Sequence, residues 1–217
     1  MVRVATVDLV HLTLIAAAFV CVASPAADSG AFVGNVMVEW LDQGDSKVKP
    51  AMRLMEEFTF VEVNGHAWRA PKGHIIEGGC IPAIFRSLVG LPFEGKQRRA
   101  AVLHDYYCHA RATPWLDVHR MFYRASLAAG VEETEAKIMY MAIYAEGHRW
   151  EPKEGSRCYN SCHAAAASLA WKPIVTEVDW HAVVEWIDQN NPALAEIEQR
   201  INAATKRPGP HIFAQGH

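Results

Sequence analysis

Cys80 stands in a setting that suits a reactive thiol. In the stretch "PKGHIIEGGCIPAIF" (71–85), Gly78 and Gly79 precede the cysteine and Pro82 follows it. Proline is favoured in the first turn of a helix, so Cys80 is predicted to lie near a helix N-terminus, where free N–H groups and the helix dipole stabilise an anion. A thiol held there has a lowered pKa and becomes a better nucleophile. The alternative is a structural residue that only caps the helix.

The neighbouring residues His104 and Asp105 could supply the base that such a nucleophile needs. His104 falls on the inward stripe of a predicted helix, so we expect its imidazole to point into the protein. Adjacent helical residues point about 100° apart, so the side chain of Asp105 does not naturally reach the His104 ring. The carboxylate that orients this imidazole could be Asp105, Asp117 or Glu77. The alternative for His104 is a hydrogen-bonded core histidine that ties helices together.

A metal site is a further arrangement of nearly the same residues. A His-Asp pair is typical of metal-dependent phosphohydrolases, and His104, Asp105 and either Asp117 or His119 could be the ligands. That class also needs an upstream histidine on a helix, whereas His74 falls on a predicted strand. We therefore assign neither a metal nor another cofactor from the sequence.

The elements that must position these residues are predicted as strands followed by helices. Strands are expected over 31–40, 53–63 and 66–76, and Asn64-Gly65 is a strong hairpin signal between the second and third. Helical periodicity then dominates, with glycines closing several segments. The predicted helices cover 81–90, 96–111, 115–130 and 132–147. This order predicts an α+β domain over 30–150, with a small antiparallel sheet followed by a helical cluster.

Residues 151–217 are predicted to form a C-terminal helical extension without chemistry of its own. A helix is expected over 158–171, and a helical hairpin over 179–189 and 192–204. The first arm of the hairpin carries a narrow apolar stripe suited to burial against the main domain. The stripe consists of Trp180, Val183, Val184 and Ile187.

Composition and charge limit the class of partner. The chain has 217 residues, of which 51% are hydrophobic, and its formal net charge is −3. This composition fits one globular domain with an appendage and gives no electrostatic case for nucleic acid or for an anionic membrane.

The N-terminal residues 1–26 resemble a secretory signal peptide. Arg3 precedes an apolar run, and Ser24 and Ala26 are small residues at the −3 and −1 positions of a cleavage site. We therefore expect a periplasmic or secreted protein with no stable membrane anchor after the signal is removed. The alternatives are an early start codon or a buried helix.

Four cysteines would remain after cleavage, and an oxidising compartment would allow them to form disulfides. Their spacing matches no zinc pattern and does not decide whether Cys108, Cys158 or Cys162 is paired.

Several motifs occur in the order typical of one family. They include "EEFTFVEVNGHAWRAPKGHIIEGGCIP", "GLPFEGKQRRAAVLHDYYC" and "DVHRMFYRASLAAGV". Together they resemble the bacterial and phage family known as domain of unknown function 1353, over about residues 30–150. The family usually has Asp-Gly-Ala-Ser-Ile-Pro where this chain has Glu77 to Pro82, and it usually has the His-Asp pair.

The resemblance implies a papain-like fold of the NlpC type and a relation to type VI secretion effectors. It therefore implies a hydrolase that cleaves amide bonds in peptidoglycan peptides by a Cys-His mechanism, with Cys80 in place of the usual serine. An immunity or secretion partner would then be expected. The competing hypotheses are a non-catalytic structural or phage-derived interaction module and the metal-dependent hydrolase described above.

Overall fold

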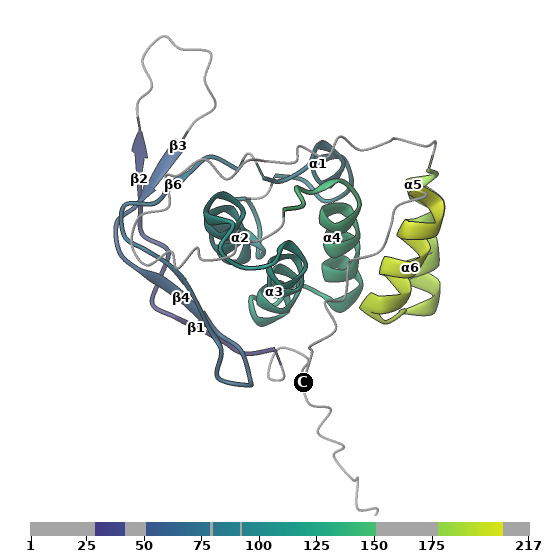
Figure 1. Cartoon of the computed structure of the whole chain (residues 1–217), viewed down its shortest axis with the longest axis horizontal. Coiled ribbons are helices and arrows are strands. Elements are labelled where there is room, and N and C mark those ends of the chain that lie inside the picture. Colours follow the sequence, from purple (N-terminus) through teal and green to yellow (C-terminus); the bar gives the residue numbers. More distant parts are fainter. Residues whose placement is uncertain (1–28, 42–50, 79, 92, 151–177, 206–217) are drawn as a thin grey trace, which may run out of the picture.

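The computed structural model of the chain describes residues 29–41, 51–78, 80–91, 93–150 and 178–205. The predicted signal peptide lies outside these residues, as does the predicted helix over 158–171. Strands come first in the described chain and helices follow (Figure 1). None of the helices in this described part combines the length and the hydropathy needed to cross a membrane.

The strands of the described residues form two three-stranded antiparallel sheets, with the orders β1-β4-β5 and β2-β3-β6. Their bounds are β1 (Ala31–Val33), β2 (Val38–Leu41), β3 (Ala51–Leu54), β4 (Phe58–Val61), β5 (Ala67–Ala70) and β6 (Ile75–Ile76).

Each long predicted strand is divided between the two sheets. Gly34 has φ of 79°, a value that favours glycine, and the chain turns there, so the stretch 31–40 supplies both β1 and β2. The two later predicted strands divide in the same way. The predicted hairpin at Asn64-Gly65 is confirmed, because it joins the paired strands β4 and β5, and the His66 N–H donates to Asn64 Oδ1 at 2.8 Å.

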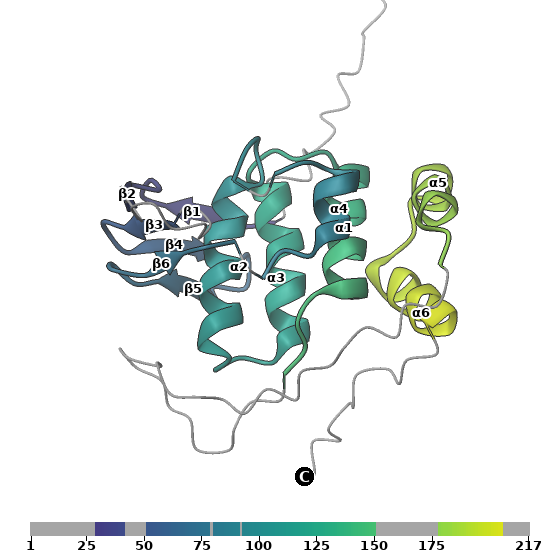
Figure 2. The same cartoon turned by 90° about the horizontal axis from the view of Figure 1, so that it is seen from above.

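The helices follow the predicted segments to within a few residues at each end. Their bounds are α1 (Ala83–Leu88), α2 (Arg98–Ala110), α3 (Trp115–Ala128), α4 (Glu133–Glu146), α5 (Trp180–Asn190) and α6 (Leu194–Thr205). Figure 2 shows them in layers: the sheets lie on one side of α2 and α3, α1 and α4 lie beyond, and α5 and α6 are outermost. The fold class is therefore α+β, as predicted.

A buried carboxylate ties the first sheet to the helices. Glu62 follows β4, and its Oε1 accepts hydrogen bonds from Trp68 Nε1 and from Arg124 Nη2, both at 2.6 Å. Phe58 and Phe60 on β4 are fully buried and contribute to the core between sheet and helices. The sheet is thus fixed against α3 by both apolar and ionic contacts.

The C-terminal helices pack on α4 through the predicted stripe. Val183 and Ile187 are buried, and Trp180 and Val184 are partly buried against the core. On α6, the buried Glu198 accepts hydrogen bonds from the guanidinium of Arg120 on α3 and from the Tyr140 hydroxyl on α4. The extension is therefore joined to the main domain by a core contact and by an ion pair.

Candidate functional site

Asp105 has a fully buried carboxylate that binds groups from three parts of the chain. Oδ1 accepts a hydrogen bond from the Gly78 N–H at 3.0 Å, and Oδ2 accepts a longer one from the Glu77 N–H at 3.4 Å. His74 Nε2 lies 3.2 Å from Oδ2. His109 Nδ1 lies 3.5 Å from Oδ2 and 2.8 Å from the main-chain oxygen of Asp105. A carboxylate and two imidazoles thus meet at one point.

The local fold explains why these groups converge. His109 follows Asp105 by one turn of α2, so the two side chains share a face of the helix. His74 directly precedes β6, whose pairing with β3 fixes its place. Gly78 has φ of 64°, and a Cβ at this position would lie 2.8 Å from the ring of Phe93. Only glycine therefore brings this N–H to the carboxylate without strain.

The electrostatics keep the carboxylate charged beside an accessible imidazole. Burial alone would raise the pKa of Asp105, but hydrogen bonds from His109 and His74 outweigh it and lower the pKa to about 2. The hydrogen bond to Asp105 raises the pKa of His109. The His109 side chain is 44% exposed and that of His74 is 11% exposed. The cluster can therefore be reached from solvent on the His109 side.

Cys80 is not a free thiol in this structure. Its sulfur is bonded to that of Cys108 on α2, and both residues are buried. Cys80 lies in a turn, three residues before Ala83, the first residue of the short helix α1. The predicted thiolate at a helix N-terminus is therefore corrected: the sulfur is oxidised, and the helix begins too late to stabilise it.

His148 lies beside this disulfide, with its Nδ1 3.8 Å from the sulfur of Cys108. The residue is exposed and follows the C-terminal end of α4. Burial of part of its ring, together with the charges of Arg111 and His109, lowers the pKa of His148. A third imidazole thus lies near the Asp105 cluster.

His104 points inward, as predicted, but it enters the core and does not meet Cys80. Neither of its ring nitrogens has a hydrogen-bond partner among the described residues. Its ring centroid lies 5.3 Å from that of His119 and 5.5 Å from that of Phe122. Burial lowers the pKa of His104 to about 4, so this imidazole is neutral at physiological pH. The predicted Cys80–His104 pair is not formed.

The two other acids predicted to orient His104, Asp117 and Glu77, do not bind its ring. Asp117 is exposed in the first turn of α3 and does not bind the ring of His104. Glu77 contributes its main-chain N–H to Asp105, while the residue itself is exposed. Of the three predicted acids, Asp105 lies in a polar cluster, but its histidine partners are His74 and His109 and not His104.

The ligand set suggested for a metal site also needs correction. His104 and His119 are neighbours, but both are sealed in the core, and Asp117 is exposed. In the described part of the chain, two groups bring together residues that could hold an ion. These groups are His74, Asp105 and His109, and separately Cys80, Cys108 and His148.

Sequence reasoning missed His74 and His109. The spacing of four residues between Asp105 and His109 on a predicted helix was a usable signal, because such residues face the same way. His74 reaches Asp105 across 31 residues of chain, and no local pattern marks that contact.

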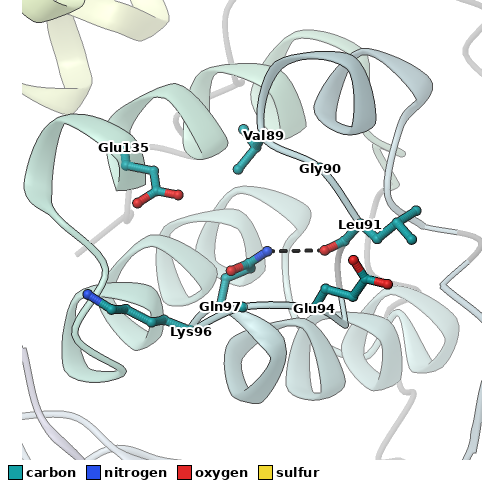
Figure 3. Close-up of a pocket in the computed structure, with 8 residues that line it drawn as sticks. Val89, Gly90, Leu91, Glu94, Lys96, Gln97 and Glu135 are labelled. Carbon is teal, nitrogen blue, oxygen red and sulfur yellow. Dashed lines mark hydrogen bonds between the residues drawn. The ribbon is translucent and has the colours of Figure 1, made fainter.

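A separate cavity has a volume of about 300 Å³, and Figure 3 shows the residues that line it. It is lined by Val89–Leu91, by Glu94–Gln97 and by Glu135, and Gln97 Nε2 donates to the Leu91 carbonyl at 3.1 Å. This cavity adjoins the N-terminal ends of α2 and α4, whereas His109 lies near the C-terminal end of α2. It is therefore not part of the Asp105 cluster.

Comparisons with known proteins leave the activity open. The chain is 40% identical over 97 residues to the uncharacterized protein y4iH of Sinorhizobium fredii, a match that covers 45% of this chain and 41% of that protein. It is 39% identical over 106 residues to the uncharacterized protein y4jT of the same organism, covering 49% and 32%. The chain thus spans less than half the length of either relative.

No solved structure matches, so the papain-like fold stays a prediction. The family resemblance itself is confirmed for the part of the chain that carries the Asp105 cluster. Residues 52–143 match the family described as protein of unknown function (DUF1353).

Proposed function

We propose that the protein is a hydrolase whose reaction centre is Asp105 with His74 and His109. One observation carries the proposal: a buried carboxylate, kept ionised by its partners, holds an imidazole that solvent can reach. Titratable groups with strongly perturbed pKa values and fixed geometry are typical of catalytic sites.

Water is the nucleophile in this proposal. Cys80 cannot attack a substrate while its sulfur is bonded to Cys108. Water would add to the carbonyl carbon of the substrate amide, the C–N bond would break, and the proton released by the water would pass to the departing amine. The Asp105 centre would activate the water and move this proton.

The family resemblance supports the proposed substrate class, and the disulfide supports the proposed compartment. A disulfide is retained in an oxidising compartment, which supports the expected periplasmic or secreted location. The family resemblance implies a cell-wall hydrolase, so the peptide amides of peptidoglycan are the substrate class to test first. Neither relative has a name that states an activity, so the substrate class and the compartment are proposals for this chain.

The test is digestion of purified peptidoglycan by the disulfide-intact protein, with the soluble products identified by mass spectrometry. The proposal predicts fragments that each carry one added water at a peptide amide. Asp105→Asn should abolish their release, because an amide cannot supply the negative charge. His66→Ala, at an exposed histidine on the β4–β5 hairpin, is the matched control and should leave release unchanged. Intact peptidoglycan after prolonged incubation with the wild type would contradict the proposal.

A further inference from the structure

We infer that His74, Asp105 and His109 bind one divalent first-row metal ion, with zinc as the expected ion. This inference deepens the proposed function, because it names how the Asp105 centre activates water. Each residue offers one donor atom, and the three donor atoms lie within 4.8 Å of one another.

The two distances from Asp105 Oδ2 to the imidazole nitrogens are close to those expected for ligands of a shared ion. Imidazole nitrogen and carboxylate oxygen bind zinc at about 2.1 Å, so two ligands of one ion lie about 3.0 to 3.4 Å apart for angles between 90° and the tetrahedral value. His74 Nε2 lies 3.2 Å from Asp105 Oδ2, and His109 Nδ1 lies 3.5 Å from the same oxygen. Small movements of the His109 ring would complete the coordination.

The surrounding structure holds the donors in place before any ion binds. The Gly78 N–H occupies Asp105 Oδ1, and Oδ2 faces the two imidazoles while it also accepts the longer hydrogen bond from the Glu77 N–H. The His74 ring packs edge-on against Tyr106, with the centroids 5.2 Å apart. Supporting contacts of this kind orient metal ligands and strengthen binding.

The hydrogen bonds that His74 Nε2 and His109 Nδ1 make to Asp105 must give way to the ion. His109 Nδ1 lies 2.8 Å from the main-chain oxygen of Asp105, so in the metal-free protein its N–H donates to that carbonyl. A bound ion takes the place of this proton, which moves to Nε2 of a neutral ring or to solvent from a protonated one. The His109 ring is partly exposed and can turn the short distance from the carbonyl to the ion.

The donor set indicates a catalytic ion. Two imidazoles and one carboxylate leave a coordination position open for water, whereas structural zinc sites fill all four positions with protein ligands. An ion at this place would act as a Lewis acid toward that water. The neighbouring group of Cys80, Cys108 and His148 cannot offer thiolates while the disulfide is intact.

The experiment uses the full chain with its disulfide intact, freed of metal with a chelator and then dialysed. Zn²⁺ is titrated by calorimetry, and Co²⁺ by its visible absorption spectrum. The wild type should bind one ion per chain at this site, with a rise in melting temperature. His109→Ala and Asp105→Asn should each weaken this binding by about 100-fold or more.

Two histidine variants separate this site from other histidines of the chain. His181→Ala removes an exposed imidazole on α5 and should bind Zn²⁺ as the wild type does. His148→Ala removes the imidazole beside the disulfide and should also leave binding unchanged. Circular dichroism of every variant verifies that it is folded. A wild type that binds no Zn²⁺ at micromolar concentration would overturn the inference, as would equal affinity in wild type, His109→Ala and Asp105→Asn.

The outcomes distinguish this inference from the proposed function. Peptidoglycan cleavage that persists at full rate in the metal-free protein would overturn the role of the ion in activating water and leave the hydrolase standing. Binding of one ion at these residues without cleavage of any cell-wall substrate would overturn the hydrolase and leave the metal site standing.

Discussion

Cys80 and Cys108 are joined by a disulfide that fastens the turn before α1 to the last turns of α2. The N–H of Gly78, two residues before Cys80, donates to the carboxylate of Asp105. The covalent link therefore holds a donor of the candidate site against the helix that carries the acceptor. We regard the disulfide as a structural support of the site and not as its nucleophile.

Removing the disulfide should lower the free energy of unfolding of the domain. The two cysteines are 28 residues apart, and closing a loop of this size stabilises a fold by roughly 3 to 4 kcal/mol in the chain-entropy account. The double variant Cys80→Ser, Cys108→Ser should lose this amount in urea denaturation. Adding a reductant should not lower the free energy of unfolding of the variant further, because this disulfide is already absent. A variant as stable as the oxidised wild type would contradict the pairing.

Alkylation should report the same pairing directly. Without reductant, iodoacetamide should leave Cys80 and Cys108 unmodified, because neither sulfur is a thiolate. After unfolding in the presence of reductant, both should be labelled. Peptide mapping by mass spectrometry reads both states. Rapid labelling of Cys80 in the native, unreduced protein would instead restore the free-thiol hypothesis.

The ion pair between α3 and α6 should hold the C-terminal helices in place. Glu198 accepts hydrogen bonds from Arg120 at 2.8 Å and from the Tyr140 hydroxyl at 2.6 Å. Glu198→Gln should lower the free energy of unfolding by about 2 kcal/mol, a value below that of a fully buried pair because Arg120 is 36% exposed. The matched control is Glu185→Gln at an exposed position of α5, where we expect less than about 0.5 kcal/mol. Equal effects of the two substitutions would contradict this role.

Mild acid should destabilise the domain through its buried histidines. Burial lowers the pKa of His104 to about 4, and burial together with the charges of His104, Arg149 and His148 places that of His119 well below its usual value of 6.5. As the pH falls below 6.5, the unfolded chain takes up protons that the folded protein excludes, so stability is lost between pH 6.5 and about 4. For His104 alone the loss is on the order of 3 kcal/mol.

Urea denaturation at several pH values between 7.5 and 4.5 measures this loss. His119→Phe keeps a ring at the position but cannot take up a proton, so its stability should fall less steeply over the same range. An unchanged free energy of unfolding between pH 7 and pH 5 would show that the two imidazoles are not sealed from water.

The helices and one hairpin could be predicted because local signals specify them. Helical periodicity marks α2 to α6, and Asn64-Gly65 marks the hairpin between β4 and β5. The division of strands between two sheets was not predictable in the same way. It depends on a positive φ at Gly34 and on pairings between segments far apart in sequence, neither of which alternation of residue types reveals.

The candidate site was only partly predictable for the same reason. Asp105 was identified because it follows a histidine on a helix, but that histidine, His104, belongs to the core. The contacts of Asp105 with His74 and Gly78 join residues about thirty positions apart and follow from tertiary packing. The pairing of Cys80 with Cys108 likewise cannot be deduced from cysteine spacing.

The most direct test of the central claim compares the rates at which three forms of the protein release new amino groups from purified peptidoglycan. We predict that Asp105→Asn loses at least about 100-fold in rate, and that the double variant Cys80→Ser, Cys108→Ser keeps measurable hydrolysis at a temperature where it is folded. The opposite pattern would contradict the account: activity retained in Asp105→Asn and abolished in the folded cysteine variant would place the reaction at the sulfur and not at the Asp105 centre.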